Sequence, residues 1–149
     1  MKKLHPEQLL QEAATAVERA YSPYSKYRVG AALLTSDGKI FRGCNVENAS
    51  YGLTVCAERV AFFTAVATGQ RQFTALAIVA TPNISPNNPH SAIHIPQSPL
   101  PYPCGACRQV MAEFCGPDFP IYIAPIGRLN VFEELRLGIL LPKSFMLGA

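Results

Sequence analysis

The spacing of apolar residues along the chain predicts a helix near its start. Apolar side chains recur at steps of three and four between Leu10 and Tyr21, as they do on a helix with one buried face. Pro6 suits the first turn of this helix, and Ser22-Pro23 ends it because the residue before a proline disfavours helical backbone. We expect the apolar face of this helix to contribute to the core and to nothing else.

The remaining pattern predicts strands and helices in alternation after an opening hairpin. Short apolar runs between turn residues indicate strands, and longer runs that end at Gly or Pro indicate helices. The expected strands are 27–35, 40–44, 75–80, 121–124 and, more weakly, 129–132; the expected helices are 56–68, 104–114 and 133–137. This order predicts a single α/β domain over residues 1–149, a three-layer α/β/α sandwich with a mixed sheet of about five strands and helices on both faces.

A proline-rich segment interrupts the alternation between residues 82 and 103. It holds seven prolines among Asn, Ser and His, and regular backbone pairing is excluded there because proline has no amide hydrogen to donate. The segment is also long for a loop inside a compact domain. We therefore interpret it as an insertion at the surface of the domain.

Composition and charge narrow the class of protein. Apolar residues make up 49% of the 149 residues, enough for a buried core, and the formal net charge of +3 is too small and scattered for a nucleic-acid surface. No stretch is long enough to span a membrane, and the first residues lack the apolar run of a signal peptide. We expect a cytoplasmic protein whose five cysteines serve a metal site or catalysis rather than disulfides.

Three of the cysteines lie at the predicted starts of two helices. Cys104 and Cys107 are three residues apart, so both thiolates can face one metal ion from the first turn of a helix. Cys56 opens the other helix and would supply a third sulfur, and the dipole at a helix start favours the thiolate form. Three protein ligands on Zn²⁺ leave one position open to water, which is typical of catalytic rather than structural zinc sites.

Charged residues close to these cysteines would complete such a site. Glu58 lies two residues after Cys56, and at a helix end its carboxylate can reach the water on the zinc and move a proton. Zn²⁺ with three thiolates carries a net charge of about −1. We expect Arg59 and Arg108 to donate hydrogen bonds to the sulfurs and to offset that charge.

These segments resemble a known family. Residues 56–58 read Cys-Ala-Glu and residues 103–107 read Pro-Cys-Gly-Ala-Cys, which is the zinc-deaminase signature in its all-cysteine form. Together with residues 45–51, which read Asn-Val-Glu-Asn-Ala-Ser-Tyr, they make the chain similar to the small, zinc-dependent, homotetrameric cytidine deaminases. The resemblance covers most of the chain apart from the proline-rich segment.

The resemblance implies a reaction in pyrimidine salvage. Cytidine or deoxycytidine would be hydrolysed to uridine or deoxyuridine and ammonia, with one Zn²⁺ bound by each chain. A hydroxide on the zinc would attack C4 of the base. Glu58 would carry a proton to N3 and later to the departing amine.

The resemblance also implies the substrate contacts. Asn45 and Glu47 match residues that hold the ribose hydroxyls, and an amide and a carboxylate two apart on an extended segment can point to the same side. Tyr27-Arg28 stands where the family usually has Phe-Pro, and Tyr27 would stack on the base as the Phe does. Ala57 resembles the residue whose backbone contacts the pyrimidine.

Two further positions bear on substrate and assembly. Tyr51 ends the 45–51 segment and is counted with the substrate contacts. Phe145 resembles a terminal aromatic that enters the pocket of a neighbouring subunit, which implies a homotetramer with shared active sites. Ile139 stands where the family commonly has Glu, a change that would alter a contact between subunits.

Other interpretations of the same residues stay open at this point. The three cysteines could form a structural zinc site with Cys44, Cys115 or a histidine as the fourth ligand, although Cys44 and Cys115 also fit small buried apolar positions. Cys104 and Cys107 also fit the spacing of a redox pair. The alternative functions are deamination of a modified or drug-like cytosine nucleoside, a zinc-stabilised binding module without turnover, and, disfavoured by the absence of a basic groove, editing of a polynucleotide.

Overall fold

The computed structural model describes residues 4–81 and 100–147, so most of the predicted insertion lies outside the described residues. The elements, in chain order, are α1 (Pro6–Val17), β1 (Val29–Thr35), β2 (Ile40–Cys44), the 3-10 turn η1 (Tyr51–Leu53), α2 (Ala57–Ala67), β3 (Phe73–Ala80), α3 (Gly105–Phe114), β4 (Pro120–Pro125), β5 (Glu133–Arg136) and α4 (Leu137–Leu140). Across these two described ranges, no helix has the length and apolar character needed to cross a membrane.

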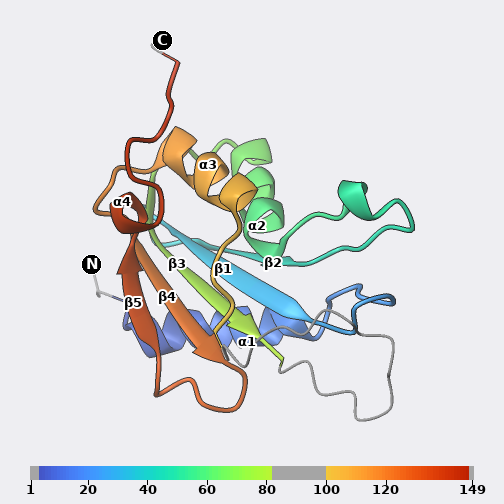
Figure 1. Ribbon diagram of the computed structural model, residues 1–149. Coiled ribbons are helices and arrows are strands. Elements are labelled where there is room, and N and C mark those ends of the chain that lie inside the picture. The colour runs from blue at the N-terminus through green and yellow to red at the C-terminus, as the bar shows by residue number, and fades with distance from the viewer. Residues whose placement is uncertain (1–3, 82–99, 148–149) are drawn as a thin grey trace.

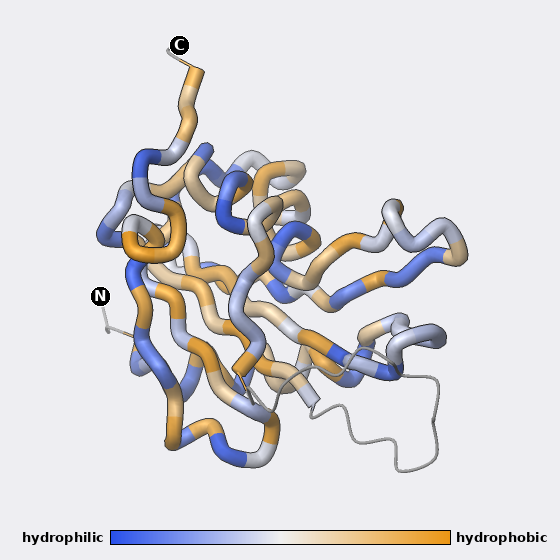
Figure 2. Tube along the Cα trace, in the orientation of Figure 1, coloured by the Kyte–Doolittle hydropathy of each residue, from blue (hydrophilic) through white to orange (hydrophobic). Residues whose placement is uncertain are grey.

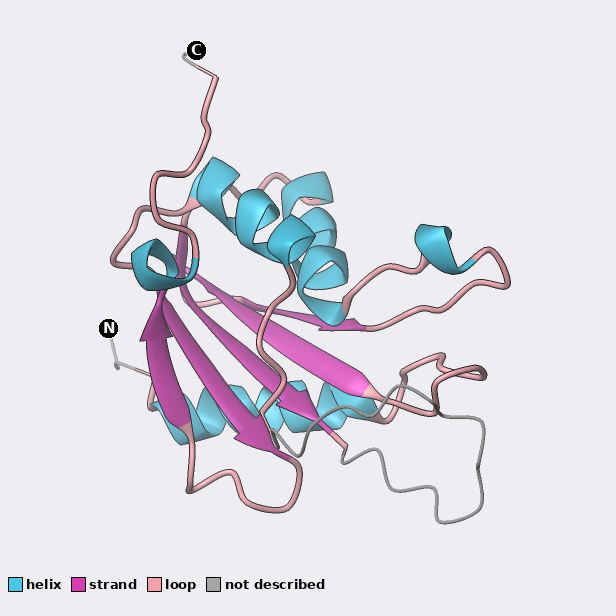
Figure 3. Cartoon of the chain, in the orientation of Figure 1, coloured by secondary structure: helices cyan, strands magenta, loops and turns pink. Residues whose placement is uncertain are grey.

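Five strands form one mixed sheet in the order β2-β1-β3-β4-β5. β1 pairs antiparallel with both β2 and β3, β3 pairs parallel with β4, and β4 pairs antiparallel with β5. Helix α1 covers one face of the sheet, and α2, α3 and α4 lie over the other (Figures 1 and 3). The predicted three-layer α/β/α architecture is confirmed.

Alternate positions of the central strands fill two separate core layers. The layer under α2 and α3 receives large strand residues, among them Leu33, Leu76, Ile78, Ile121 and Ile123. The layer under α1 receives mostly smaller ones, among them Ala32, Ala75, Ala77, Val79 and Ala124. Because both faces of β3 are covered from Ala75 onward, residues 75–80 form an unbroken apolar run rather than an alternating one (Figure 2).

Helix α1 ends four residues earlier than its apolar spacing predicts. The helix stops at Val17, and Tyr21 leaves it to pair with the loop that follows β2. The Tyr21 amide donates to the Asn45 carbonyl at 3.0 Å, and the Tyr21 carbonyl accepts from the Glu47 amide at 2.8 Å. Pairing between distant segments therefore overrides the local helical spacing at this end.

The last strand and helix are displaced from their predicted positions. We expected a strand over 129–132 and a helix over 133–137, whereas β5 spans Glu133–Arg136 and α4 spans Leu137–Leu140. Leu135 lies opposite Ile121 in the sheet, and Leu137 is buried under α3. Strand pairing and burial override the helical preference of the Glu-Glu-Leu sequence, so this prediction is wrong in register.

Helix α2 approaches β2 closely because Gly43 has no side chain. A Cβ atom at Gly43 would lie 2.5 Å from the Ala61 amide nitrogen and would collide with the carbonyl oxygen of Ala57. Both of those atoms belong to the first two turns of α2. The position of the helix start that carries the candidate site thus depends on a glycine in the neighbouring strand.

Replacing Gly43 with alanine is expected to destabilise the protein. The added methyl group must push α2 away from the sheet, which typically costs about 1–3 kcal/mol in a packed core. The free energy of unfolding, measured by urea denaturation of the metal-free protein, should fall by that amount. Gly52→Ala is the matched control because nothing lies within 4 Å of its added Cβ; equal stability of the two variants would contradict the packing argument.

Candidate functional site

Three cysteines from two helix starts converge on one point. Cys56 is the N-cap of α2, Cys104 is the N-cap of α3, and Cys107 lies in the first turn of α3. The Sγ atom of Cys104 lies 3.7 Å from that of Cys56 and 3.4 Å from that of Cys107, and all three sulfurs lie within 4.8 Å of one another. The two helices lie next to each other on the same face of the sheet (Figure 1).

The geometry and chemistry of this cluster suit zinc. Tetrahedral Zn²⁺ with Zn–S bonds of about 2.3 Å places its sulfur ligands roughly 3.8 Å apart, close to the distances between these cysteines. Cys107 is buried, Cys56 is half-buried and Cys104 is exposed, so the cluster is open on one side. The three residues can therefore hold the ion and leave a position free for a further ligand.

The other two cysteines lie outside this cluster. The Sγ atom of Cys44 donates to the Arg19 carbonyl at 3.3 Å, and burial raises the pKa of Cys115 to about 12. Within residues 4–81 and 100–147, the group of metal-ligating side chains around Cys56 consists of three cysteines. The structure thus gives no support to Cys44 or Cys115 as the fourth ligand of a structural site.

Glu58 is a buried carboxyl group in the first turn of α2. Only 5% of its surface is exposed. Burial raises its pKa to about 7, and the nearby negative charge of Cys56 acts in the same direction. A carboxyl group with a pKa close to neutrality can both accept and return a proton at physiological pH.

The pKa of the Cys56 thiol is lowered, whereas that of the Glu58 carboxyl group is raised. A hydrogen bond with Cys107 is the largest cause that lowers the pKa of Cys56 to about 5, and hydrogen bonds from Arg59 and Cys104 add to it. The Arg59 Nη2 atom lies 3.6 Å from the Cys56 sulfur and also donates to the Thr54 carbonyl at 3.2 Å. Arg59 therefore stands where a cation can offset the charge of the thiolates.

Arg108 does not share this arrangement, which corrects the expectation that both arginines donate to sulfur. Its Nε atom donates to the Pro103 carbonyl and its Nη1 atom to the Leu140 carbonyl, each at 2.8 Å. Consecutive residues on a helix do not face the same side, so Arg108 projects away from the direction of Cys107. Arg108 instead joins the start of α3 to the end of α4.

Asn45 and Glu47 are buried and already hydrogen-bonded to the segment that leads into β1. The Asn45 side chain accepts from the Val29 amide and donates to the Tyr27 carbonyl, both at 2.8 Å. The Glu47 carboxylate accepts from the amides of residues 24 and 25 at 2.9 and 3.2 Å. The sequence singled out both side chains as substrate contacts, and no motif records that their backbone partners lie 16 to 23 residues away.

The remaining predicted substrate residues fall into two groups. Burial raises the pKa of Tyr27 to about 12, and the negative charge of Glu58 adds to the shift, so these two side chains belong to one electrostatic environment. Ala57 is fully buried at the start of α2. Tyr51 and Phe145 are instead 54% and 68% exposed, on η1 and on the C-terminal tail.

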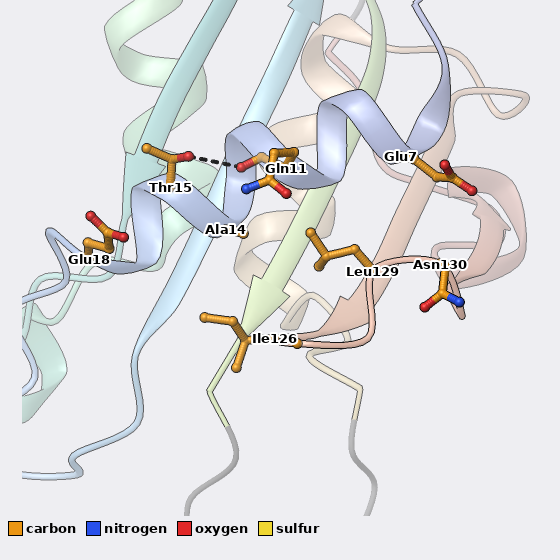
Figure 4. Close-up of a pocket in the computed structure, with 9 residues that line it drawn as sticks. Glu7, Gln11, Ala14, Thr15, Glu18, Ile126, Leu129 and Asn130 are labelled. Carbon is orange, nitrogen blue, oxygen red and sulfur yellow. Dashed lines mark hydrogen bonds between the residues drawn. The ribbon is translucent and has the colours of Figure 1, made fainter.

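A separate groove of about 600 Å³ lies on the opposite side of the sheet. Figure 4 shows it between α1 and the loop after β4, with Glu7, Gln11, Glu18 and Asn130 among its lining residues. The Thr15 hydroxyl at its edge donates to the Gln11 carbonyl within α1 at 3.0 Å. The sheet separates this groove from the three cysteines, so it is not part of the candidate site.

Comparisons with known proteins agree with the geometry of the site. A family described as the cytidine and deoxycytidylate deaminase zinc-binding region matches residues 4–123. The chain is 47% identical to a cytidine deaminase of Sporosarcina psychrophila over 93% of this chain and 90% of the relative. It is 46% identical to one of Halalkalibacterium halodurans over 92% and 91%, respectively. A crystal structure of cytidine deaminase from Burkholderia pseudomallei superposes with a TM-score of 0.80 at 42% identity, covering 95% of this chain and 100% of that one.

The two arginines should differ in their effect on Cys56. Arg59→Gln removes a cation that stabilises the thiolate, so the pKa of Cys56 should rise from about 5 toward the usual thiol value. Arg108→Gln should leave this pKa unchanged because its guanidinium group contacts carbonyl oxygens. The measurement is the pH dependence of iodoacetamide alkylation of Cys56 in metal-free protein, with the labelled peptide identified by mass spectrometry. Equal shifts in the two variants would refute the assignment.

Proposed function

The chain belongs to the cytidine and deoxycytidylate deaminase family, and from this membership we propose that it hydrolyses free cytidine and deoxycytidine to uridine and deoxyuridine with release of ammonia. The observation that carries the proposal is the convergence of three cysteine sulfurs beside one buried carboxyl group. A structural zinc site needs four ligands and has no use for such a carboxyl group. We assign this hydrolysis of cytidine and deoxycytidine to pyrimidine salvage in the cytoplasm.

Cys56, Cys104 and Cys107 are the proposed ligands of one Zn²⁺ per chain. These three residues would hold the ion, which when bound would supply the Lewis acidity that makes water a nucleophile toward C4 of the base. The two helix starts stabilise the negative charge of the three sulfurs through their exposed amide groups. Arg59 adds a full positive charge next to Cys56.

Glu58 is the proposed proton carrier. Its carboxylate takes a proton from the attacking water and gives it to N3 of the base. It then takes the proton of the new C4 hydroxyl group and gives it to the amino group, which leaves as ammonia when the C4–N bond breaks. In the metal-free chain, burial raises the pKa of this group to about 7, which favours return of a proton as well as its uptake. The position of Glu58 in the first turn of α2 holds it close to Cys56.

Tyr27, Ala57, Asn45 and Glu47 are the proposed contacts of the nucleoside. Tyr27 stacks on the base, and the backbone of Ala57 contacts the pyrimidine. The Asn45 side chain uses one of its two N–H groups and one of its two oxygen lone pairs in hydrogen bonds to the Tyr27 carbonyl and the Val29 amide. The second N–H group and the second lone pair remain for a ribose hydroxyl group. Glu47, as a carboxylate, accepts the hydrogen of a sugar hydroxyl beside its backbone donors.

The proposed assembly is a homotetramer with shared active sites. Helix α2 carries Phe63 half-exposed on its outer side, and Leu53 just before the helix is 67% exposed. The C-terminal tail likewise exposes Phe145 and Leu147 and extends away from the rest of the chain (Figure 1). A second copy of the chain would cover these apolar side chains, with Phe145 contributing to the pocket of the neighbouring subunit, whereas Tyr51 is a proposed substrate contact.

Glu58→Gln tests the proposed reaction directly. The amide keeps the shape of the side chain and leaves the three cysteines unchanged, but it cannot carry a proton. We expect the rate of cytidine deamination, measured as the decrease in ultraviolet absorbance, to fall at least a hundredfold. The zinc content should stay at one per chain. Glu113→Gln, an exposed change on α3, is the matched control and should retain full activity.

Three results would contradict the proposed function. The zinc-loaded wild type could fail to deaminate cytidine and deoxycytidine while acting on a bulky cytosine analogue, which would favour a modified nucleoside as the substrate. It could bind zinc without any turnover, which would favour a binding module. Full activity of Glu58→Gln would remove the proposed proton carrier.

Phe145→Ala tests the shared active site. Loss of the aromatic ring should weaken the contact with the neighbouring subunit, so a larger share of the protein should dissociate on dilution and KM for cytidine should rise several-fold. Light scattering after size exclusion, together with steady-state kinetics, measures both effects. Val131→Ala, at a comparably exposed position outside the tail, is the control. A fully active monomeric wild type would contradict the proposed assembly.

A further inference from the structure

The hydroxyl group of Ser25 connects two of the proposed nucleoside contacts. It donates a hydrogen bond to Oε1 of Glu47, and it accepts one from the backbone amide of Tyr27 at 3.0 Å. The amide of Ser25 donates to the other oxygen of the same carboxylate at 3.2 Å. One residue thus holds both oxygens of Glu47 and the backbone of the residue proposed to stack on the base.

The backbone between these two contacts is in an unfavourable conformation. Lys26 lies between Ser25 and Tyr27 with a φ of 59°, in the left-handed region that non-glycine residues rarely adopt. Its amide donates to the Ser22 carbonyl at 3.1 Å. Such a conformation persists only where the surrounding contacts hold it, and here Glu47 holds the residues before Lys26.

The residues after Lys26 are held from the other side of the same loop. The Asn45 side chain binds the Tyr27 carbonyl and the Val29 amide. Without the Ser25 hydroxyl, however, the Tyr27 amide would lose its acceptor, and Glu47 would lose its side-chain donor. Among the described residues, Ser25 therefore supplies the hydroxyl group that links the Glu47 carboxylate to the backbone of Tyr27.

We propose that Ser25 is a positioning residue that aligns Glu47 and Tyr27 for nucleoside binding through these two hydrogen bonds. This inference rests on the proposed function, because it assigns Ser25 to the binding half of that site. The three cysteines and Glu58 lie at the starts of α2 and α3, whereas the hydrogen bonds of the Ser25 hydroxyl group go to Glu47 and Tyr27. Loss of this group should therefore weaken binding and leave the chemical step intact.

Ser25→Ala tests the proposal by steady-state kinetics. Loss of a hydrogen bond to a charged group should raise KM for cytidine roughly tenfold. The kcat should stay within about twofold and the zinc content should be unchanged, because the lost contacts contribute equally to ground-state and transition-state binding. Ser25→Thr retains the hydroxyl and should restore most of the affinity, and Ser36→Ala, in the turn between β1 and β2, is the matched control.

Hydrogen exchange tests the same contacts without relying on activity. In Ser25→Ala the Tyr27 amide has no acceptor, so peptides that cover residues 24–28 should exchange faster, while peptides from α2 and β3 should not change. Ser25→Thr should exchange as the wild type does. These measurements use the zinc-loaded full chain.

The results separate this inference from the proposed function. If the wild type fails to deaminate cytidine, the proposed function fails, and Ser25 loses its role in binding whatever the exchange shows. If the wild type is active but Ser25→Ala keeps the wild-type KM or the wild-type exchange at 24–28, the positioning role alone is overturned. It is also overturned if Ser25→Thr is as impaired as Ser25→Ala, or if kcat and zinc content fall with KM.

Discussion

The close packing of α2 on β2 and α3 is the constraint on which the candidate site depends. Gly43 lets the first turn of α2 rest on the backbone of β2, and this contact sets the position of Cys56 and Glu58. Farther along the two helices, the ring of Phe62 in the middle of α2 stacks on that of Phe114 at the end of α3, with centroids 6.0 Å apart. The three cysteines lie at the starts of two different helices. A shift of either helix would therefore move the sulfurs apart even if every residue of the site were unchanged.

The electrostatics of the site follow from the same packing. Burial makes ionisation of Glu58 unfavourable, whereas hydrogen bonds from Cys107 and Arg59 make ionisation of Cys56 favourable. In the metal-free chain the pKa of the Cys56 thiol is thus lowered to about 5 and that of the Glu58 carboxyl group is raised to about 7, the reverse of the usual order for a thiol and a carboxyl group. The arrangement localises negative charge on sulfur, where a cation binds, and leaves the carboxyl group free to exchange a proton.

Sequence patterns predicted the layers, most strands and the three cysteines that cluster, because each depends on local spacing or on a short motif. They failed where a distant contact decides the outcome. The register of β5 depends on Leu135 pairing with Ile121, and the partners of Arg108 lie at Pro103 and at the end of α4. The hydrogen bonds of Ser25 could not be predicted from the sequence for the same reason. Ser25 and Glu47 meet only when the loop after β2 folds back on the segment before β1.

The Tyr27-Arg28 pair, where the resemblance implies Phe-Pro, forms contacts that proline could not make. The Arg28 amide donates to the Thr81 hydroxyl at 3.2 Å, which a residue without an amide hydrogen could not do. The Arg28 guanidinium group donates to the Glu18 carbonyl at the end of α1, where a cation also complements the helix dipole. The segment therefore gains from α1 and from the end of β3 the restraint that a proline ring provides through its fixed φ. Its conformation at Tyr27 is thereby held from three sides, by α1, by Thr81 and by the loop that carries Asn45 and Glu47.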